Sequence, residues 1–337
     1  MNKLSDDQVR HLRDLVDAPD LSGTRYEIVR RLAAGGMATV FLVRDRELER
    51  EVALKVLTVA DQGGELVKRM LREAQIVARL EHPGIVPIHD VGRLPDGRVF
   101  YTMKYVEGVT LEQFASPART LPELVRVLQR VCEALAFAHA HGVLHRDLKP
   151  SNIMIGAFGE VLVMDWGIAR RASDTESTPN VAAGNDHPAT DTAPGMALGT
   201  PAYMAPEQAL GRPELIDQRT DVYGLGGVLY FILTGHAPKS GSGEAEIIPP
   251  RTHDRKIPRR IEAICLRALA ADPRERYPDV TSFADDLDAF LAGESVSAYP
   301  ETIFERVGRW TQRNQLVVIL ILVYLLVRVL FLFWRHA

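Results

Sequence analysis

Residue types suited to chemistry gather in one short segment, His145-Arg146-Asp147-Leu148-Lys149-Pro150-Ser151-Asn152, with Asp165 thirteen residues after its last member. The segment is polar, lies between two apolar stretches, and brings a carboxylate, an ammonium group and an amide close together. Such groups take a proton from a hydroxyl, neutralise phosphate and hold a metal ion. A charged surface loop is the alternative for any one of these residues, but the combination predicts a site of phosphate chemistry.

Two predicted elements position this segment. Apolar residues recur at helical spacing from Leu121 to His141, which predicts a core helix that delivers the chain to His145. After Asn152, residues 153–155 and 161–164 alternate around two glycines as a small hairpin. The hairpin would return Asp165 to the side of Asn152, so that a metal site becomes plausible.

The upstream part of the chain reads as strands and one helix. Strands are predicted at 26–32, 52–57 and 100–106, and a helix from Leu66 to Leu80. Lys55 alternates against apolar neighbours in the second of these strands. A solvent-facing lysine is the alternative there, and Glu73 is the only carboxylate between Glu65 and Glu81 in the predicted helix.

The order of these motifs resembles the bacterial serine/threonine protein kinases of eukaryotic type. His-Arg-Asp-x-x-x-x-Asn is the catalytic-loop pattern of protein kinases, and Asp165-Trp166-Gly167, Ala205-Pro206-Glu207 and the late motif at 272–277 follow in the expected sequence. The resemblance covers roughly residues 26–291. It implies an α+β, two-lobed fold with a small β-rich lobe and a larger helical lobe.

The resemblance also implies roles for individual residues. Asp147 would accept the proton of a substrate hydroxyl, and Lys149 would offset charge on the transferred group. Asn152 and Asp165 would hold Mg²⁺, and Lys55, aimed by Glu73, would bind the ATP phosphates. The implied nucleotide-binding set is Leu32, Gly35, Gly36, Val40, Ala53, Lys55, Met103, Lys104, Val106 and Met154.

Two departures from the family pattern leave alternatives open. Ala33 and Ala38 stand where the phosphate-covering turn usually has glycine, which bears on ATP affinity, and Trp166 replaces the usual Phe. The favoured function is ATP-dependent phosphorylation of Ser and Thr residues on proteins. A pseudokinase acting as a membrane-tethered scaffold is the alternative, and a small-molecule phosphotransferase is a third.

A regulatory loop is expected between Asp165 and Ala205. Residues 172–194 are rich in Ser, Thr, Asp, Pro and Ala and read as a loop. Arg146, directly before Asp147, implies control by loop phosphorylation, because a buried guanidinium needs a negative partner. We expect the kinase to phosphorylate its own loop, between Ser173 and Thr200.

The resemblance further predicts two structural contacts in the large lobe. Asp221 would brace the backbone of the catalytic loop, and Arg276 would pair with Glu207.

Charge and cysteine content indicate which kinds of partner and site to expect. The net charge of −4 gives no case for a nucleic-acid partner. The only cysteines, Cys132 and Cys265, lie in apolar helical patterns, which predicts buried thiols rather than a disulfide or zinc site. Protein substrates are the expected partners, and a homodimer is left open.

The C-terminal region predicts a membrane anchor. Leu316 to Trp334 contains nineteen residues with Arg328 as the only charge, and as a helix it would span roughly 28 Å. Basic residues precede it, so the N-terminal part would lie in the cytoplasm of a single-pass inner-membrane protein. The expected organisation is an extension (1–25), a small lobe (26–106), a large lobe (107–292), a linker (293–314) and a transmembrane helix (315–334).

Overall fold

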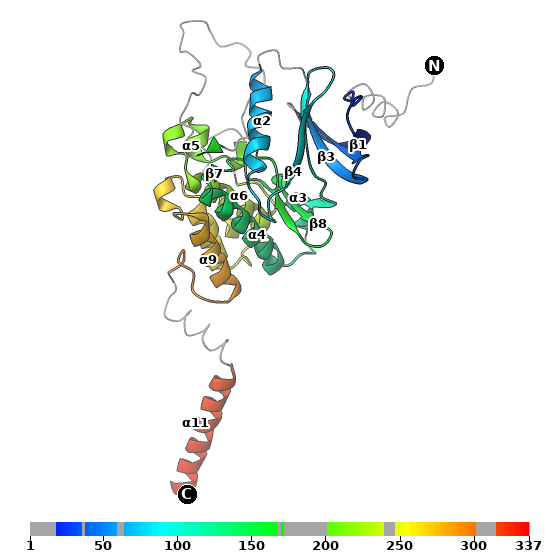
Figure 1. Ribbon diagram of the computed structural model, residues 1–337. Helices are drawn as coiled ribbons and strands as arrows, with labels where there is room; N and C mark the ends of the chain where they lie inside the picture. The colour runs from blue at the N-terminus through cyan, green and yellow to red at the C-terminus, as the bar shows by residue number, and fades with distance from the viewer. Residues whose placement is uncertain are drawn as a thin grey trace, which may run out of the picture.

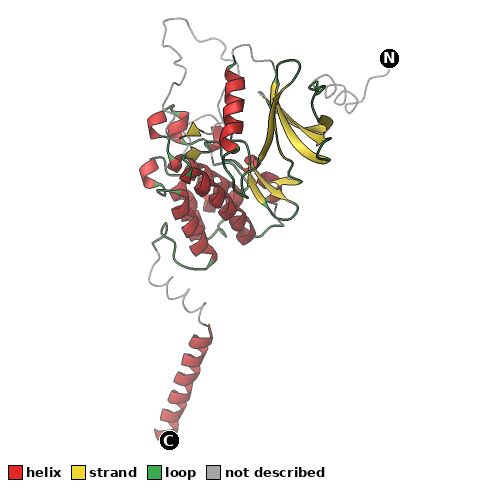
Figure 2. Cartoon of the chain, in the orientation of Figure 1, coloured by secondary structure: helices red, strands yellow, loops and turns green. Residues whose placement is uncertain are grey.

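The computed structural model describes residues 18–35, 38–58, 64–116, 118–166, 170–171, 201–238, 247–300 and 315–336. Residues 1–17 of the expected extension and the expected regulatory loop at 172–194 lie outside these ranges. The described chain forms a β-rich lobe and a helical lobe (Figures 1 and 2). The two-lobed arrangement expected from the sequence is therefore present.

The small lobe is a five-stranded antiparallel sheet with helix α2 packed against it (Figure 1). The strand order is β1-β2-β3-β5-β4, so β3 and β5 lie side by side although β4 separates them in sequence. An apolar cluster joins the inner face of the sheet to α2. The elements are β1 (Tyr26–Ala34), β2 (Ala38–Asp45), β3 (Arg50–Leu57), α2 (Glu65–Val77), β4 (Ile88–Arg93) and β5 (Val99–Lys104).

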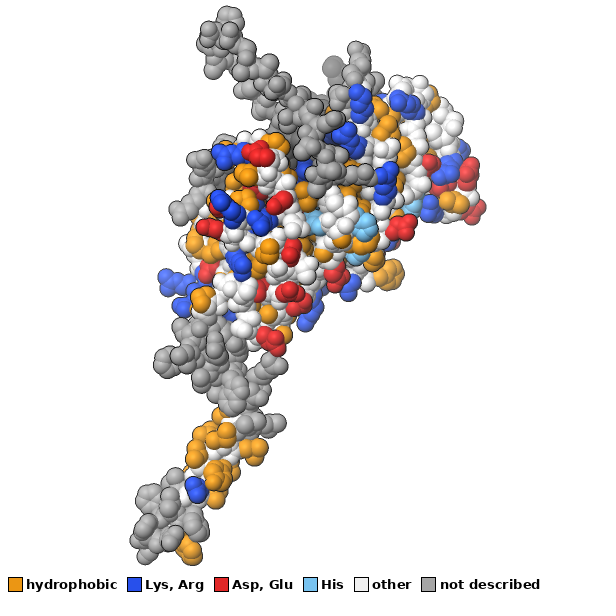
Figure 3. Space-filling view, turned by 60° about the vertical axis from the view of Figure 1, so that its left-hand side comes forward, with side chains coloured by type: hydrophobic (Ala, Val, Ile, Leu, Met, Phe, Trp, Pro, Cys, Tyr) orange, Lys and Arg blue, Asp and Glu red, His pale blue; other side chains and the backbone are white. Residues whose placement is uncertain are grey.

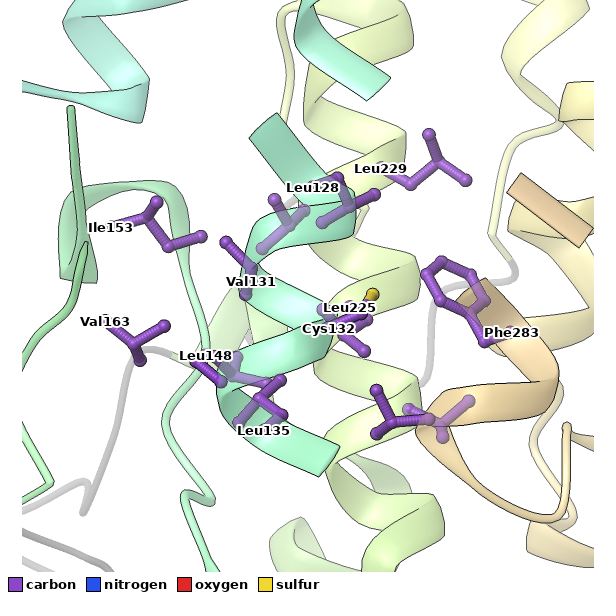
Figure 4. Close-up of a cluster of buried hydrophobic side chains, with 14 of the residues drawn as sticks. Leu128, Val131, Cys132, Leu135, Leu148, Ile153, Val163, Leu225, Leu229 and Phe283 are labelled. Carbon is purple, nitrogen blue, oxygen red and sulfur yellow. The ribbon is translucent and has the colours of Figure 1, made fainter. Parts of the chain in front are cut away.

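The large lobe is built around helices α4 and α6. Their buried leucines and valines meet in one core together with Phe283 of α9, as Figure 4 shows. The helices are α3 (Leu111–Phe114), α4 (Leu121–Ala140), α5 (Pro206–Ala209), α6 (Gln218–Thr234), α7 (Pro250–His253), α8 (Arg259–Ala268) and α9 (Val280–Leu291). Short strands are β6 (Gly108–Thr110), β7 (Val143–Leu144), β8 (Ile153–Gly156), β9 (Val161–Val163) and β10 (Arg170–Arg171).

Capping residues explain where the two central helices begin. Thr120 and Glu123 form a capping box at the start of α4, which satisfies exposed backbone N–H groups. Asp217 caps α6 by accepting a bond from the N–H of Arg219. Because of this cap, α6 begins at Gln218.

A separate helix, α11 (Gln315–His336), occupies the C-terminal region. Within the part of the chain that the structure describes, no helix combines the length and hydropathy needed to cross a bilayer. The transmembrane assignment of 315–334 is thus not shown, and side chains of α11 are described only at 318–328 and 334. Figure 3 shows these side chains as mostly hydrophobic, whereas both charge signs are interspersed over the lobes.

Candidate active site

Lys55 occupies the centre of a buried charge cluster. Strands β3 and β5 pair so that Lys55 lies opposite Tyr101, and α2 brings Glu73 to the same point. The Lys55 Nζ donates to Glu73 Oε1 at 2.9 Å and to Asp165 Oδ1 at 2.7 Å. The structure therefore joins the lysine to the helix carboxylate that the sequence selects and to the carboxylate that follows β9.

Electrostatic interactions favour the charged forms of Lys55 and Asp165. Burial lowers the pKa of Lys55, but Tyr101, Asp165 and Glu73 raise it, and the net pKa lies well above its ordinary value. Burial raises the pKa of Asp165, and Lys55 lowers it more, so the net pKa lies below its ordinary value. A cationic lysine beside an ionised aspartate is the state that binding of phosphate and a metal ion requires.

The catalytic loop folds back on itself through its own side chains. Lys149 Nζ donates to Asp147 Oδ2 at 3.0 Å, and the Asn152 amide donates to Asp147 O at 2.9 Å and to Asp147 Oδ2 at 3.2 Å. The N–H of Met164 donates to the Asn152 carbonyl at 2.7 Å. The hairpin of β8 and β9 thus returns the residue before Asp165 to Asn152, as the sequence pattern predicts.

Two residues in this region adopt left-handed backbone conformations that are uncommon for residues other than glycine. Arg146 has a φ of 68° and Asp165 a φ of 58°. Each such residue costs about 1 kcal/mol or more and persists only where its surroundings impose it. Both flank the catalytic side chains, which is where such strain tends to concentrate.

Asp221 imposes the conformation of the loop at Arg146. Its carboxylate accepts the N–H of His145 at 2.8 Å and the N–H of Arg146 at 2.7 Å, and it is fully buried. Burial raises the pKa of Asp221, and bonds from His139 and the loop lower it below its ordinary value. The brace predicted for Asp221 is therefore present.

The predicted nucleotide residues line one apolar cluster. Ala53, Met103 and Val106 are buried in it, and Leu32, Val40 and Met154 pack against them. The N–H of Lys104 donates to the Pro87 carbonyl at 3.1 Å, so Lys104 would meet an adenine edge with its carbonyl. Their roles in binding ATP stay predictions.

The alanines of the predicted phosphate-covering turn lie in paired strands, and a register shift in β1 falls directly before Ala33. Ala33 pairs with Val40 across β1 and β2, and Ala38 pairs with Leu57 across β2 and β3. The N–H of Gly35 donates to the Ala38 carbonyl at 2.9 Å, which closes the hairpin. Gly36 lies outside the described residues. The two substitutions are thus compatible with the hairpin.

The donor set suits magnesium bound together with ATP phosphates. Asn152 uses its amide N–H groups within the loop, which leaves its Oδ1 as the ligand atom, and Asp165 supplies a carboxylate. Among the described residues, no group of three or more His, Cys, Asp or Glu could hold a metal. Mg²⁺ is commonly held by one or two protein oxygens plus substrate phosphates, so two ligands are sufficient.

Three contacts at the site were not predicted. The Tyr101 hydroxyl donates to Glu73 Oε1 at 2.8 Å, His139 Nε2 lies 2.7 Å from Asp221 Oδ2, and Gln208 Nε2 donates to the Arg146 carbonyl at 2.9 Å. None of the three follows from sequence spacing, because each joins residues that lie far apart in the sequence.

Comparisons with known proteins agree with this geometry. The family model "Protein kinase domain" matches residues 26–292. Serine/threonine-protein kinase PknD of Chlamydia pneumoniae is 38% identical over 294 residues, covering 80% of this chain and 31% of the relative. Serine/threonine-protein kinase PknB of Mycolicibacterium smegmatis is 39% identical over 300 residues, covering 83% and 45%. The chain therefore spans less than half the length of these relatives.

A solved structure gives the same result for the fold. The crystal structure of the Mycobacterium tuberculosis PknI kinase domain matches with a TM-score of 0.62 and 29% identity, covering 80% of this chain and 98% of that one. The family model's range, 26–292, includes both lobes and the residues Lys55, Glu73 and Asp165. The chain belongs to the protein kinase domain family.

Proposed function

We propose that this protein transfers the γ-phosphoryl group of ATP to Ser and Thr hydroxyls of proteins. One observation carries the proposal. Lys55 contacts both Glu73 and Asp165, and Asn152 is hydrogen-bonded to Asp147 in the neighbouring loop. Relatives named serine/threonine-protein kinases support the choice of hydroxyl acceptor. Every charged residue that the chemistry needs is in place, which favours an enzyme over a pseudokinase scaffold.

Each residue has a defined task in this proposal. Asp147 accepts the proton of the attacking hydroxyl, and Lys149, 3.0 Å from it, offsets negative charge on the transferred group. Lys55 binds the ATP phosphates at their other end, oriented by Glu73. Mg²⁺ supplies charge neutralisation between the phosphates and would be held by Asn152 and Asp165.

Transfer of labelled phosphate from ATP to a generic basic protein tests the proposal. Wild type should label Ser and Thr, and Lys55→Met, which removes the phosphate-binding ammonium, should not. Absence of transfer together with absence of magnesium-ATP binding would favour the scaffold. Labelling of small hydroxyl compounds but not of protein would favour a small-molecule phosphotransferase.

We also propose autophosphorylation of the segment between Ser173 and Thr200, which lies outside the described residues. The proposal rests on the sequence: Arg146 precedes Asp147, and the segment between Asp165 and Ala205 carries several Ser and Thr residues. Mass spectrometry of wild type beside Asp147→Asn tests it. Equal phosphate in the segment of both proteins would contradict it.

Finally, we propose that α11 attaches the protein to the inner membrane as a single-pass anchor, with the kinase lobes in the cytoplasm. Support comes from the single charge between Leu316 and Trp334 and from Arg306, Arg309 and Arg313 before it. Fractionation of the full chain and of a chain ending at residue 300 tests this. Recovery of both in the soluble fraction would contradict it.

A further inference from the structure

Tyr101 makes a contact that the catalytic scheme does not use. It lies on β5, is 3% exposed, and its hydroxyl donates to Glu73 Oε1 at 2.8 Å. The same carboxylate oxygen accepts the Lys55 ammonium at 2.9 Å. Glu73 therefore has two donors, one from the ion pair and one from a neutral phenol.

The Lys55 ammonium and the Tyr101 hydroxyl differ in the number of acceptors that they serve. Lys55 also donates to Asp165 at 2.7 Å and, in the proposed function, must reach the ATP phosphates. Among the contacts described for the Tyr101 hydroxyl, the Glu73 carboxylate is the acceptor. A change in the partners of Lys55 thus leaves the Tyr101 bond in place.

Burial makes the phenol a constant donor. Burial raises the pKa of Tyr101 well above its ordinary value, although Lys55 lowers it. The hydroxyl therefore keeps its proton over the whole physiological pH range. A hydrogen bond to an ionised carboxylate in a buried site is among the stronger kinds that proteins make.

Helix α2 packs on the sheet through apolar side chains, including Leu66 and Val67 near its N-terminus. Its N-cap residue, Gly64, makes no side-chain cap hydrogen bond. On the inner face, Met70 and Ala74 of α2 pack in the apolar cluster that contains Tyr101. The hydrogen bond from Tyr101 to Glu73 fixes the orientation of this carboxylate, which apolar packing alone does not.

We propose that Tyr101 is a positioning residue that holds the Glu73 carboxylate, and with it α2, in the lysine-binding orientation whether or not nucleotide is bound. The kinetic consequence of this proposal rests on the proposed function, but the structural consequence does not. The contact requires a hydroxyl at this strand position, and phenylalanine would fill the same space without it.

Hydrogen exchange in the nucleotide-free full chain tests the structural consequence. Tyr101→Phe should speed exchange of the amides in α2 about tenfold. The matched control is Tyr277→Phe, which removes a buried tyrosine bond to Asp286, 2.7 Å long, in the helical lobe. Unchanged exchange in α2 of Tyr101→Phe, or equal acceleration by the control, would overturn the proposal.

A double-mutant cycle tests whether Tyr101 acts through Glu73. Tyr101→Phe should lower kcat/KM for ATP about tenfold, whereas Tyr277→Phe should leave it unchanged. In a Glu73→Ala background, Tyr101→Phe should have no further effect. A full tenfold effect in that background would overturn the proposal. Wild type inactive in every assay would instead refute the proposed function, and the exchange result would still decide the role of Tyr101.

Discussion

Two buried ion pairs in this molecule are built in opposite ways. Arg276 and Glu207 form a closed pair: two guanidinium nitrogens each lie 2.8 Å from a different carboxylate oxygen, and the side chains are 0% and 2% exposed. Lys55 forms an open pair, shared between Glu73 and an Asp165 side chain that is 55% exposed. Both side chains of the closed pair are buried, whereas the Asp165 side chain of the open pair is exposed to solvent.

The difference follows from what surrounds each cation. The guanidinium of Arg276 also donates to the carbonyls of Ala270, Ala271 and Arg219, and Thr220 donates to Glu207, so this pair is saturated by protein. A saturated pair can only contribute to structure. Lys55 and Asp165 can exchange partners for phosphate and metal, so the open pair can serve chemistry.

The largest expected effect is on the open pair. Lys55→Met should lower kcat/KM for phosphate transfer by about 10³, because it removes the charge that binds the phosphates. It should lower the free energy of unfolding by less than Arg276→Met does, since Glu73 keeps its bond from Tyr101 and Asp165 is exposed. Steady-state kinetics and urea denaturation measure the two quantities, and a large stability loss would contradict the distinction.

Breaking the closed pair should have the reverse result. Arg276→Met should lower the free energy of unfolding by about 3 to 5 kcal/mol, because Glu207 is left buried without its counter-charge. Arg274→Met is the matched control, since Arg274 pairs with Asp272 but its side chain is 84% exposed. An exposed pair of this kind contributes about 0 to 1 kcal/mol. Equal losses in both variants would show that burial of the pair is irrelevant.

Acid should weaken the closed pair. Burial raises the pKa of Glu207, but Arg276 lowers it, and the net pKa lies below its ordinary value of 4.5. A carboxyl with a lower pKa in the folded state stabilises the protein above its unfolded pKa, and this contribution is lost as the pH falls through the folded pKa. Denaturation of wild type should therefore show a loss of stability on acidification below about pH 4.5 that Glu207→Gln lacks. Parallel pH profiles for the two proteins would contradict this.

The smallest expected change in the free energy of unfolding is that of Trp166→Phe, next to Asp165 of the open pair. The Trp166 indole is 1% exposed and donates to the Val163 carbonyl at 3.2 Å. Trp166→Phe removes this neutral bond and should lower the free energy of unfolding by about 1 kcal/mol. Thermal or urea denaturation measures the loss. A loss as large as that of Arg276→Met would mean that this bond matters as much as the closed pair.

The sequence was sufficient for most contacts of the open pair. Glu73 was selected through the family resemblance, as the only carboxylate between Glu65 and Glu81, and Asp165 because a hairpin returns it to Asn152. The closed pair was predicted as well, but only from the family motif, because Arg276 and Glu207 lie 69 residues apart.

Other features depend on tertiary contacts that spacing does not reveal. Tyr101 reads as an ordinary strand aromatic until the register of β3 and β5 places it opposite Lys55. His139 reads as a polar residue near the end of a helix until α4 and α6 bring it to Asp221.

The most direct test of the distinction between the two pairs is the rate of phosphate transfer per folded molecule in Lys55→Met and Arg276→Met. Both proteins would be assayed at a temperature at which each remains folded. We predict that Lys55→Met loses about 10³ in rate, whereas Arg276→Met stays within about threefold of wild type. Equal losses in the two variants would contradict the assignment of the open pair to chemistry and the closed pair to stability.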